Sequence, residues 1–165
     1  MTQPTTALPT TRWLDTDEQR AWRAYLRGTR MLEEALDRDL QAHGLQLSEY
    51  EIISMLSETP GGRLRMSELA DIVVQSRSRL THTATRLEKR GWVVRQPCES
   101  DRRGVELVLT DTGRDVIADA ASAHVASVRR HLVDVMSTEE FAALGVAMDK
   151  VVTAAPDTDR CSEGA

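Results

Sequence analysis

The side chains best suited to recognition chemistry lie in one run between Ser76 and Arg86, which holds hydroxyl, imidazole and guanidinium groups and no acid. The planar guanidinium of Arg77 matches the O6 and N7 acceptors of guanine. The neighbouring hydroxyl and imidazole groups suit base edges or phosphates, whereas Arg86, further along, suits a phosphate. The run therefore predicts contacts with double-stranded DNA, and its candidate residues are Ser76, Arg77, Ser78, Thr81, His82 and Arg86.

A single helix is expected to position these groups. Its apolar positions recur with the spacing of a helix that packs on a core: Leu80, Ala84 and Leu87. Ser76 suits the N-cap of this helix, and Gly91 suits its end, where a left-handed residue is needed. A short helix is expected just upstream, over residues 67–73, with only a tight turn between the two. Such a pair predicts a helix-turn-helix whose second helix lies in the DNA major groove.

A hairpin with a charged tip is expected directly after this helix. Residues 92–97 and 105–109 are rich in β-branched side chains and flank a charged turn, which predicts a wing. An arginine at such a tip fits the narrow, electronegative minor groove. We expect Arg102 or Arg103 to take this place, with Asp101 holding the guanidinium, and the sequence does not choose between them. Taken alone, the turn would equally suit an ordinary solvated loop.

The basic helix, followed by Asp101-Arg102-Arg103-Gly104 in the turn, resembles the MarR family of winged-helix transcription regulators. The resemblance runs from about residue 18 to residue 152. It implies a mainly α fold with a small β-hairpin wing, in which a winged helix-turn-helix module is flanked by dimerisation helices. It also implies a homodimer that binds a short inverted repeat, most often as a repressor. An activator, or a regulator without effector response, fits the same residues.

The resemblance further implies a small aromatic acid as effector, bound in a crevice between the winged module and the dimerisation helices. An aromatic surface beside a cation would suit such a ligand. The candidate ligand-binding residues lie near the start of the first helix: Trp13, Trp22, Arg23 and Tyr25. The competing interpretation places Trp22 and Tyr25 in a dimer core and Arg23 in an exposed salt bridge.

Capping patterns mark the outer helices. Asp15, with Glu18 three residues later, predicts the start of a long first helix. Its apolar stripe is longer than a small winged module can cover, which favours a second copy of the chain as its partner. Another long helix is expected from residue 111, with an apolar face that reaches Val135. A capping box that begins at Ser137 predicts the last helix.

Similar patterns open the module itself. Ser48, with Glu51 three residues later, predicts a capping box, and residues 63–66 suit a short strand that pairs with the wing. We therefore expect a flexible N-terminal tail at 1–14, a single MarR-like domain at 15–153 and a flexible C-terminal tail at 154–165. Within the domain, the winged module spans about 47–110 and the dimerisation helices span about 15–43 and 111–153.

The charge of the chain is unevenly divided. Residues 63–104 hold ten Lys and Arg against five Asp and Glu, a balance of +5, which leaves −10 on the remainder of a chain whose net charge is −5. A basic module in an acidic body is typical of a protein that meets DNA with one face. The main alternative is a winged-helix module that binds another protein. Binding to phosphates would weaken steeply with salt, whereas an apolar protein interface would not.

Other classes of function find little support in the sequence. It holds no phosphate-binding glycine loop, no Gly-x-Ser-x-Gly motif and no metal-ligand spacing, so we predict neither an enzyme nor a cofactor or metal site. Two cysteines, Cys98 and Cys161, are too few for a disulfide framework, and the sequence does not decide whether Cys98 is redox-active. The chain lacks a signal-peptide pattern and an apolar run of membrane-spanning length, which predicts a cytoplasmic protein without a membrane partner.

Overall fold

The computed structural model describes residues 11–73, 75–98 and 104–155. Its elements are, in order, α1 (Thr16–Gln41), α2 (Leu47–Glu58), the 3₁₀ turn η1 (Pro60–Gly62), β1 (Arg63–Arg65), α3 (Met66–Ile72), α4 (Arg77–Lys89), β2 (Val93–Pro97), β3 (Val105–Leu109), α5 (Asp111–His131), the 3₁₀ turn η2 (Val133–Val135) and α6 (Thr138–Ala154). The expected fold class is confirmed, because the described chain is mainly helical with a small antiparallel sheet.

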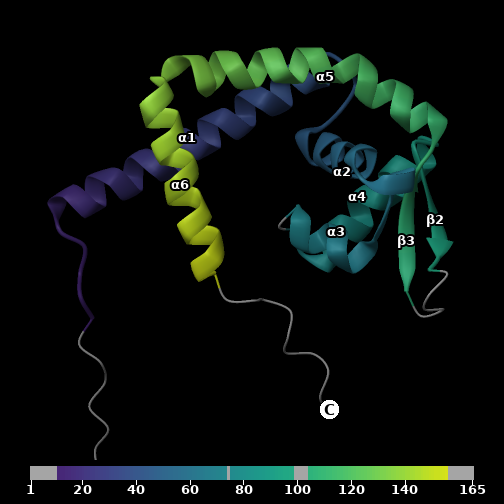
Figure 1. The fold of residues 1–165 in the computed structure, drawn as a ribbon, viewed down its shortest axis with the longest axis horizontal. Helices are drawn as coiled ribbons and strands as arrows, with labels where there is room; N and C mark the ends of the chain where they lie inside the picture. The colour runs from purple at the N-terminus through teal and green to yellow at the C-terminus, as the bar shows by residue number, and fades with distance from the viewer. Residues whose placement is uncertain (1–10, 74, 99–103, 156–165) are drawn as a thin grey trace, which may run out of the picture.

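The elements form a compact winged module with long helices attached to it (Figure 1). Helices α2, α3 and α4 and the sheet make up the module. Helix α5 packs along α1 and also contacts α2, so these two long helices connect to the module near its upper edge. The N-terminal half of α1 extends away from the module, and α6 leads back from the distant end of α5.

The sheet joins the short strand β1 to the wing. Its strand order is β1-β3-β2 and both pairings are antiparallel, with Leu64 opposite Leu107 and Val94 opposite Val108. The predicted pairing of residues 63–66 with the wing is therefore confirmed, although Met66 already belongs to α3. The sheet ties the end of the recognition helix to the segment that precedes α3.

The core of the module lies between α2, α4 and the sheet. The predicted apolar face of α4 is fully buried, with Leu80, Ala84 and Leu87 all 0% exposed. It packs in one cluster with apolar side chains of α2 and of strands β2 and β3. Ile72, the last residue of α3, lies outside this core and is 50% exposed. The next residue, Val73, packs against the core, so Ile72 lies on the side of the chain that faces solvent.

Two helix boundaries also differ from the predictions. Helix α2 is capped by Gln46 together with Glu49, not by Ser48 with Glu51. The backbone N–H of Leu47 donates to Asp37 of α1 at 2.8 Å, which fixes Leu47 in the first turn of α2. Helix α5 ends at His131 and gives way to η2, so Val135 is not part of its apolar face and is 66% exposed.

Candidate nucleic-acid interface

Helix α4 presents the predicted polar face to solvent. Ser76 is its N-cap, as expected, and its Oγ accepts a hydrogen bond from the backbone N–H of Arg79 at 3.3 Å. The Thr81 hydroxyl donates to the carbonyl oxygen of Arg77 at 2.7 Å. The five candidates on the first half of the helix are all exposed: Ser76, Arg77, Ser78, Thr81 and His82. The geometry thus brings them together on one accessible surface, as a helix in the major groove requires.

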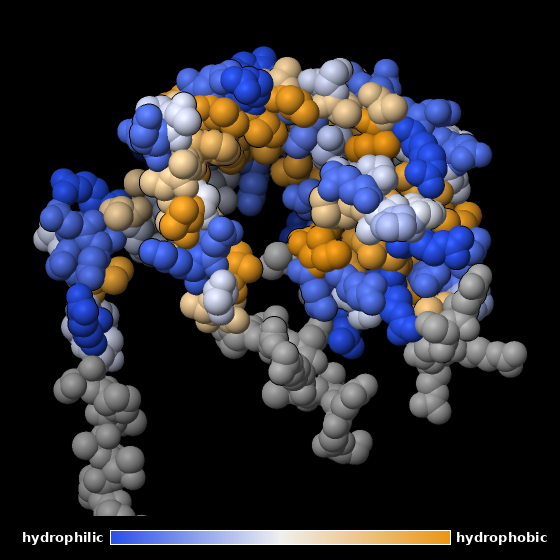
Figure 2. All heavy atoms as spheres, viewed as in Figure 1, coloured by the Kyte–Doolittle hydropathy of each residue, from blue (hydrophilic) through white to orange (hydrophobic). Residues whose placement is uncertain are grey.

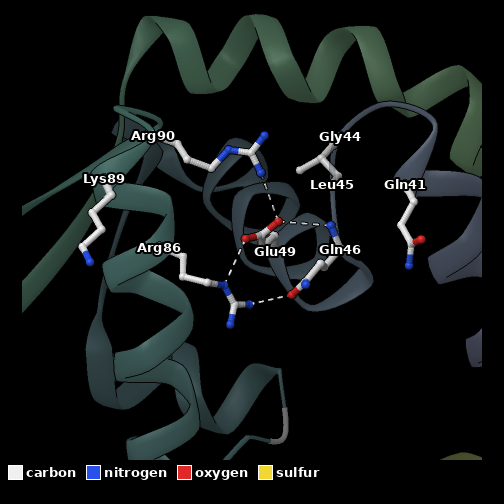
Figure 3. A pocket seen from close by; sticks show the side chains of 8 residues that line it. All are labelled: Gln41, Gly44, Leu45, Gln46, Glu49, Arg86, Lys89 and Arg90. Atoms are coloured by element: carbon white, nitrogen blue, oxygen red, sulfur yellow. Dashed lines mark hydrogen bonds and ion pairs between the residues drawn. The ribbon is translucent and has the colours of Figure 1, made fainter.

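Arg86 lies one turn further along and is held by α2 (Figure 3). Its Nε donates to Glu49 Oε1 at 3.2 Å, and its Nη2 donates to Gln46 Oε1 at 2.8 Å. The Glu49 side chain is 4% exposed, whereas that of Arg86 is 46% exposed. Arg86 therefore combines a fixed inner edge with an accessible outer edge. The sequence did not reveal this network, because Glu49 and Arg86 are 37 residues apart.

Glu49 also binds the last turn of the recognition helix. Its Oε2 accepts a hydrogen bond from Arg90 Nη1 at 3.4 Å, and its Oε2 also accepts one from the backbone N–H of Gln46 at 3.1 Å. The Arg90 guanidinium lies over the Trp92 ring, 3.6 Å from the ring centroid. One buried carboxylate therefore anchors Arg86 of α4 and the C-cap residue Arg90 to the start of α2, and charge-assisted bonds of this kind are stronger than neutral ones.

A second ion pair joins α4 to the wing. Arg95 of β2 donates through Nη1 to Glu88 Oε2 at 2.5 Å and through Nη2 to the Thr81 carbonyl oxygen at 3.0 Å. At the base of the turn, the backbone N–H of Cys98 donates to the Gly104 carbonyl oxygen at 2.9 Å. The wing candidates Asp101, Arg102 and Arg103 lie outside the described residues. The buried thiol of Cys98 donates to Glu106 Oε1 at 3.3 Å.

The candidate ligand residues lie far from the winged module in a single protomer. Trp13 is 83% exposed and precedes α1, whose N-terminal half extends away from the module (Figure 1). The rings of Trp22 and Tyr25 stack with centroids 5.9 Å apart, and both are about half exposed. Arg23 donates to Gln19 Oε1 at 3.3 Å. These four residues form an exposed aromatic and cationic stretch, and a crevice at this place would need a second chain.

The cleft between α1 and the module has a different chemistry. It has a volume of about 720 Å³ and its lining includes the carboxylates of Glu33, Glu34, Asp37 and Glu51, together with Arg79. Burial raises the pKa of Glu51, and the nearby Glu33 carboxylate acts in the same direction. Because acids outnumber cations in this cleft, its field disfavours an anionic ligand within a single protomer.

Among residues 11–73, 75–98 and 104–155, no three His, Cys, Asp or Glu side chains are grouped so as to hold a metal ion. In the same ranges, none of the helices combines the length and the apolar character that a membrane span requires.

Comparisons with known proteins agree with this geometry. Residues 43–104 match the sequence model of the MarR family. The chain is 30% identical over 122 residues to the HTH-type transcriptional regulator PecS of Dickeya dadantii, covering 73% of each protein.

Solved structures of Streptomyces coelicolor regulators are also similar. The chain resembles AbsC, a MarR family transcriptional regulator, with 46% identity and a TM-score of 0.82, covering 87% of this chain and 97% of that one. It resembles Sco3205, solved in complex with DNA, with 41% identity and a TM-score of 0.85, covering 91% and 95%. With its described helix-turn-helix and wing strands, the chain belongs to the MarR family of DNA-binding transcription regulators.

Proposed function

We propose that the chain binds a short inverted repeat of double-stranded DNA as a homodimer and represses transcription. The observation that carries this proposal is the exposed polar face of α4, which rests on a fully buried apolar face. Sco3205, which is 41% identical, was solved in complex with DNA and supports the same use of the surface. Repression is the output that the family resemblance favours, and the cytoplasm is the compartment that we assign.

The unpartnered apolar surface of the long helices supports a homodimer. Helix α6 has no buried residue, and its exposed apolar side chains include Phe141, Val146, Val151 and Val152. Figure 2 shows apolar side chains open to solvent on α6. Several exposed apolar side chains on one helix, with none of its residues buried, favour an interface with another chain. A two-fold dimer would hold two recognition helices about one turn of DNA apart, so that they read an inverted repeat.

We also propose that a small aromatic anion releases the dimer from DNA. The stacked rings of Trp22 and Tyr25, with the Arg23 guanidinium on the same turn of α1, support a site that a partner protomer would complete. If the anion binds best when the two recognition helices have a spacing that does not match the operator, its binding weakens the operator complex. The test is a screen of aromatic carboxylates against the complex, repeated with Trp22→Ala. Release that does not depend on Trp22 would exclude this site.

The decisive experiment for DNA recognition is selection of bound sequences from a random duplex library at low and at physiological salt. We expect an inverted repeat with half-sites about one helical turn apart. Arg77→Ala should then lose discrimination at one base pair by about 1–3 kcal/mol. An equal loss of affinity on every sequence would contradict the assignment of Arg77 as a base reader. Binding that ignores sequence would contradict a specific regulator, and no binding at either salt would favour the protein-binding module.

A further inference from the structure

A polar hollow flanks the recognition helix on the side that faces the start of α2. It has a volume of about 400 Å³, and all the residues that line it are polar while none is an acid. Two cations and one imidazole come from α4, and hydroxyl groups come from both elements and from the cap. The residues that matter here are Ser48, Ser76, Ser78, Arg79, His82 and Arg86. The wall of the hollow itself offers donors and positive charge and holds no carboxylate, although Ser48 and Arg79 stand between it and the acidic cleft next to α1.

Several donors in this hollow are unused. Within the described part of the chain, the side chains of Ser48, Ser78 and His82 form no hydrogen bond or ion pair, although each lines the hollow. A polar group that has no protein partner is normally satisfied by solvent or by a ligand. Hydroxyl and imidazole donors arranged around two guanidinium groups match an anion with several acceptor oxygens.

Arg86 is oriented toward such a ligand before it binds. Glu49 accepts from its Nε and Gln46 accepts from its Nη2, so two contacts hold the guanidinium plane (Figure 3). Glu49 itself is buried and is fixed by Arg90 on its other oxygen. No hydrogen bond is formed by Arg86 Nη1 to any residue that the structure describes. An arginine fixed in this way loses less side-chain entropy on binding than a free one.

The position of the hollow identifies the source of the anion. It shares Ser76, Ser78 and His82 with the face of α4 that carries the base-reading candidates. When that face enters the major groove, the flanks of the helix meet the sugar-phosphate backbone at the groove edge. We propose that the hollow seats one DNA backbone phosphate in each half-site, with Ser48, Arg79 and Arg86 as its ligands. Glu49 is the positioning residue that holds Arg86 in place.

This proposal rests on the proposed DNA binding and extends it to α2. The first test measures affinity for a generic duplex between 50 and 200 mM salt. Loss of one phosphate contact in Arg86→Gln should reduce the slope of log affinity against log salt by about 0.9 per protomer. Lys89→Gln is the matched control, because it removes a charge from the same helix at a residue that does not line the hollow. Equal slope changes in the two variants would overturn the proposal.

Glu49→Gln separates positioning from simple electrostatics. This variant makes the region more positive by one charge, so a role through charge alone would strengthen DNA binding at every salt concentration. If Glu49 positions Arg86, its loss should instead weaken binding several-fold on all sequences, and Arg86→Gln should add little to it. Stronger binding by Glu49→Gln, or fully additive losses, would exclude the positioning role.

The second test locates the phosphate. Single backbone phosphates of the selected operator are replaced in turn by neutral methylphosphonate. Wild type should lose roughly tenfold in affinity at one position in each half-site, and Arg86→Gln should show no further loss at that position, whereas Lys89→Gln should still show it. If the losses of Arg86→Gln match those of wild type at every position, the hollow does not hold a DNA phosphate. Inorganic phosphate is also added to the protein without DNA. If it raises the melting temperature of wild type and not of Arg86→Gln, while the methylphosphonate scan shows no dependence on Arg86, the hollow binds a free anion and not a DNA phosphate.

The two proposals fail in different ways. If library selection yields no specific operator, the proposed regulator function fails, but the salt slopes on a generic duplex still test the hollow. If an operator is found, but neither the salt dependence of affinity nor the methylphosphonate scan depends on Arg86, the phosphate site is rejected and the proposed regulator function stands.

Discussion

Replacing Gly113 by alanine should distort the joint between the winged module and α5. Gly113 lies buried in the first turn of α5. The backbone N–H of Thr110 donates to the Trp92 carbonyl oxygen at 3.0 Å, and the Thr110 hydroxyl donates to the Gly91 carbonyl oxygen at 2.7 Å. A Cβ on residue 113 would lie 2.7 Å from Leu109 Cδ1 and closer still to the Trp92 carbonyl oxygen. The close approach therefore requires a residue without a side chain.

Two effects oppose each other in Gly113→Ala. Alanine favours a helix over glycine by up to about 1 kcal/mol. Overpacking costs about 1–3 kcal/mol in most cores, and it should be at the upper end here because the obstructing atom is a backbone oxygen. That oxygen is held by its bond to Thr110, so relief requires α5 to move. We expect Gly113→Ala to lower the free energy of unfolding by about 2 kcal/mol.

The chain offers a matched control for this substitution. Gly28 lies inside α1, and a Cβ there would meet no heavy atom of the protomer within 4 Å. Gly28→Ala should therefore gain up to about 1 kcal/mol from helix propensity.

Urea unfolding at one fixed protomer concentration would measure both variants, because a dimer's stability depends on concentration. A Gly113→Ala variant as stable as wild type would refute the argument, since the contact with Trp92 would then be absent in solution.

Two further predictions concern the outer helices. Burial lowers the pKa of His124, whose ring lies 4.1 Å from that of Tyr50 and whose Nδ1 lacks a hydrogen-bond partner among the described residues. Because the unfolded chain then binds a proton that the folded chain does not, stability should fall as the pH drops below about 6.5. His124→Phe should keep the ring contact and lessen the loss measured by urea unfolding between pH 7.5 and 5.5; an undiminished loss would assign it to other groups. Val151→Lys should place a charge on the exposed apolar surface of α6 and halve the mass measured by sedimentation equilibrium. An unchanged mass would remove this surface from the dimer interface.

Local signals in the sequence predicted the recognition helix well. The cap at Ser76, the apolar spacing from Leu80 to Leu87 and the left-handed Gly91 each depend on neighbouring residues, and all three are found in the structure. The start of α2 was missed for the opposite reason. Both Ser48 and Gln46 have a glutamate three residues later, so the local pattern fits either. The choice is made by Asp37, which is distant in sequence and accepts a hydrogen bond from Leu47.

The orientation of the reading face is set by residues that the sequence did not identify. Glu49 anchors the C-terminal half of α4 to α2, and Glu88 joins the same helix to the wing through Arg95. Glu49 lies 37 and 41 residues from its two arginines, so those pairs form only when the module folds, whereas Glu88 pairs with Arg95 across the short turn that follows α4.

Ion pairs on both sides of the recognition helix hold it in one orientation before DNA binds. Because the groups are placed before binding, the interface pays less entropy when the complex forms. Substitutions at Glu49 or Glu88 should therefore change operator affinity even where the carboxylate touches no nucleotide.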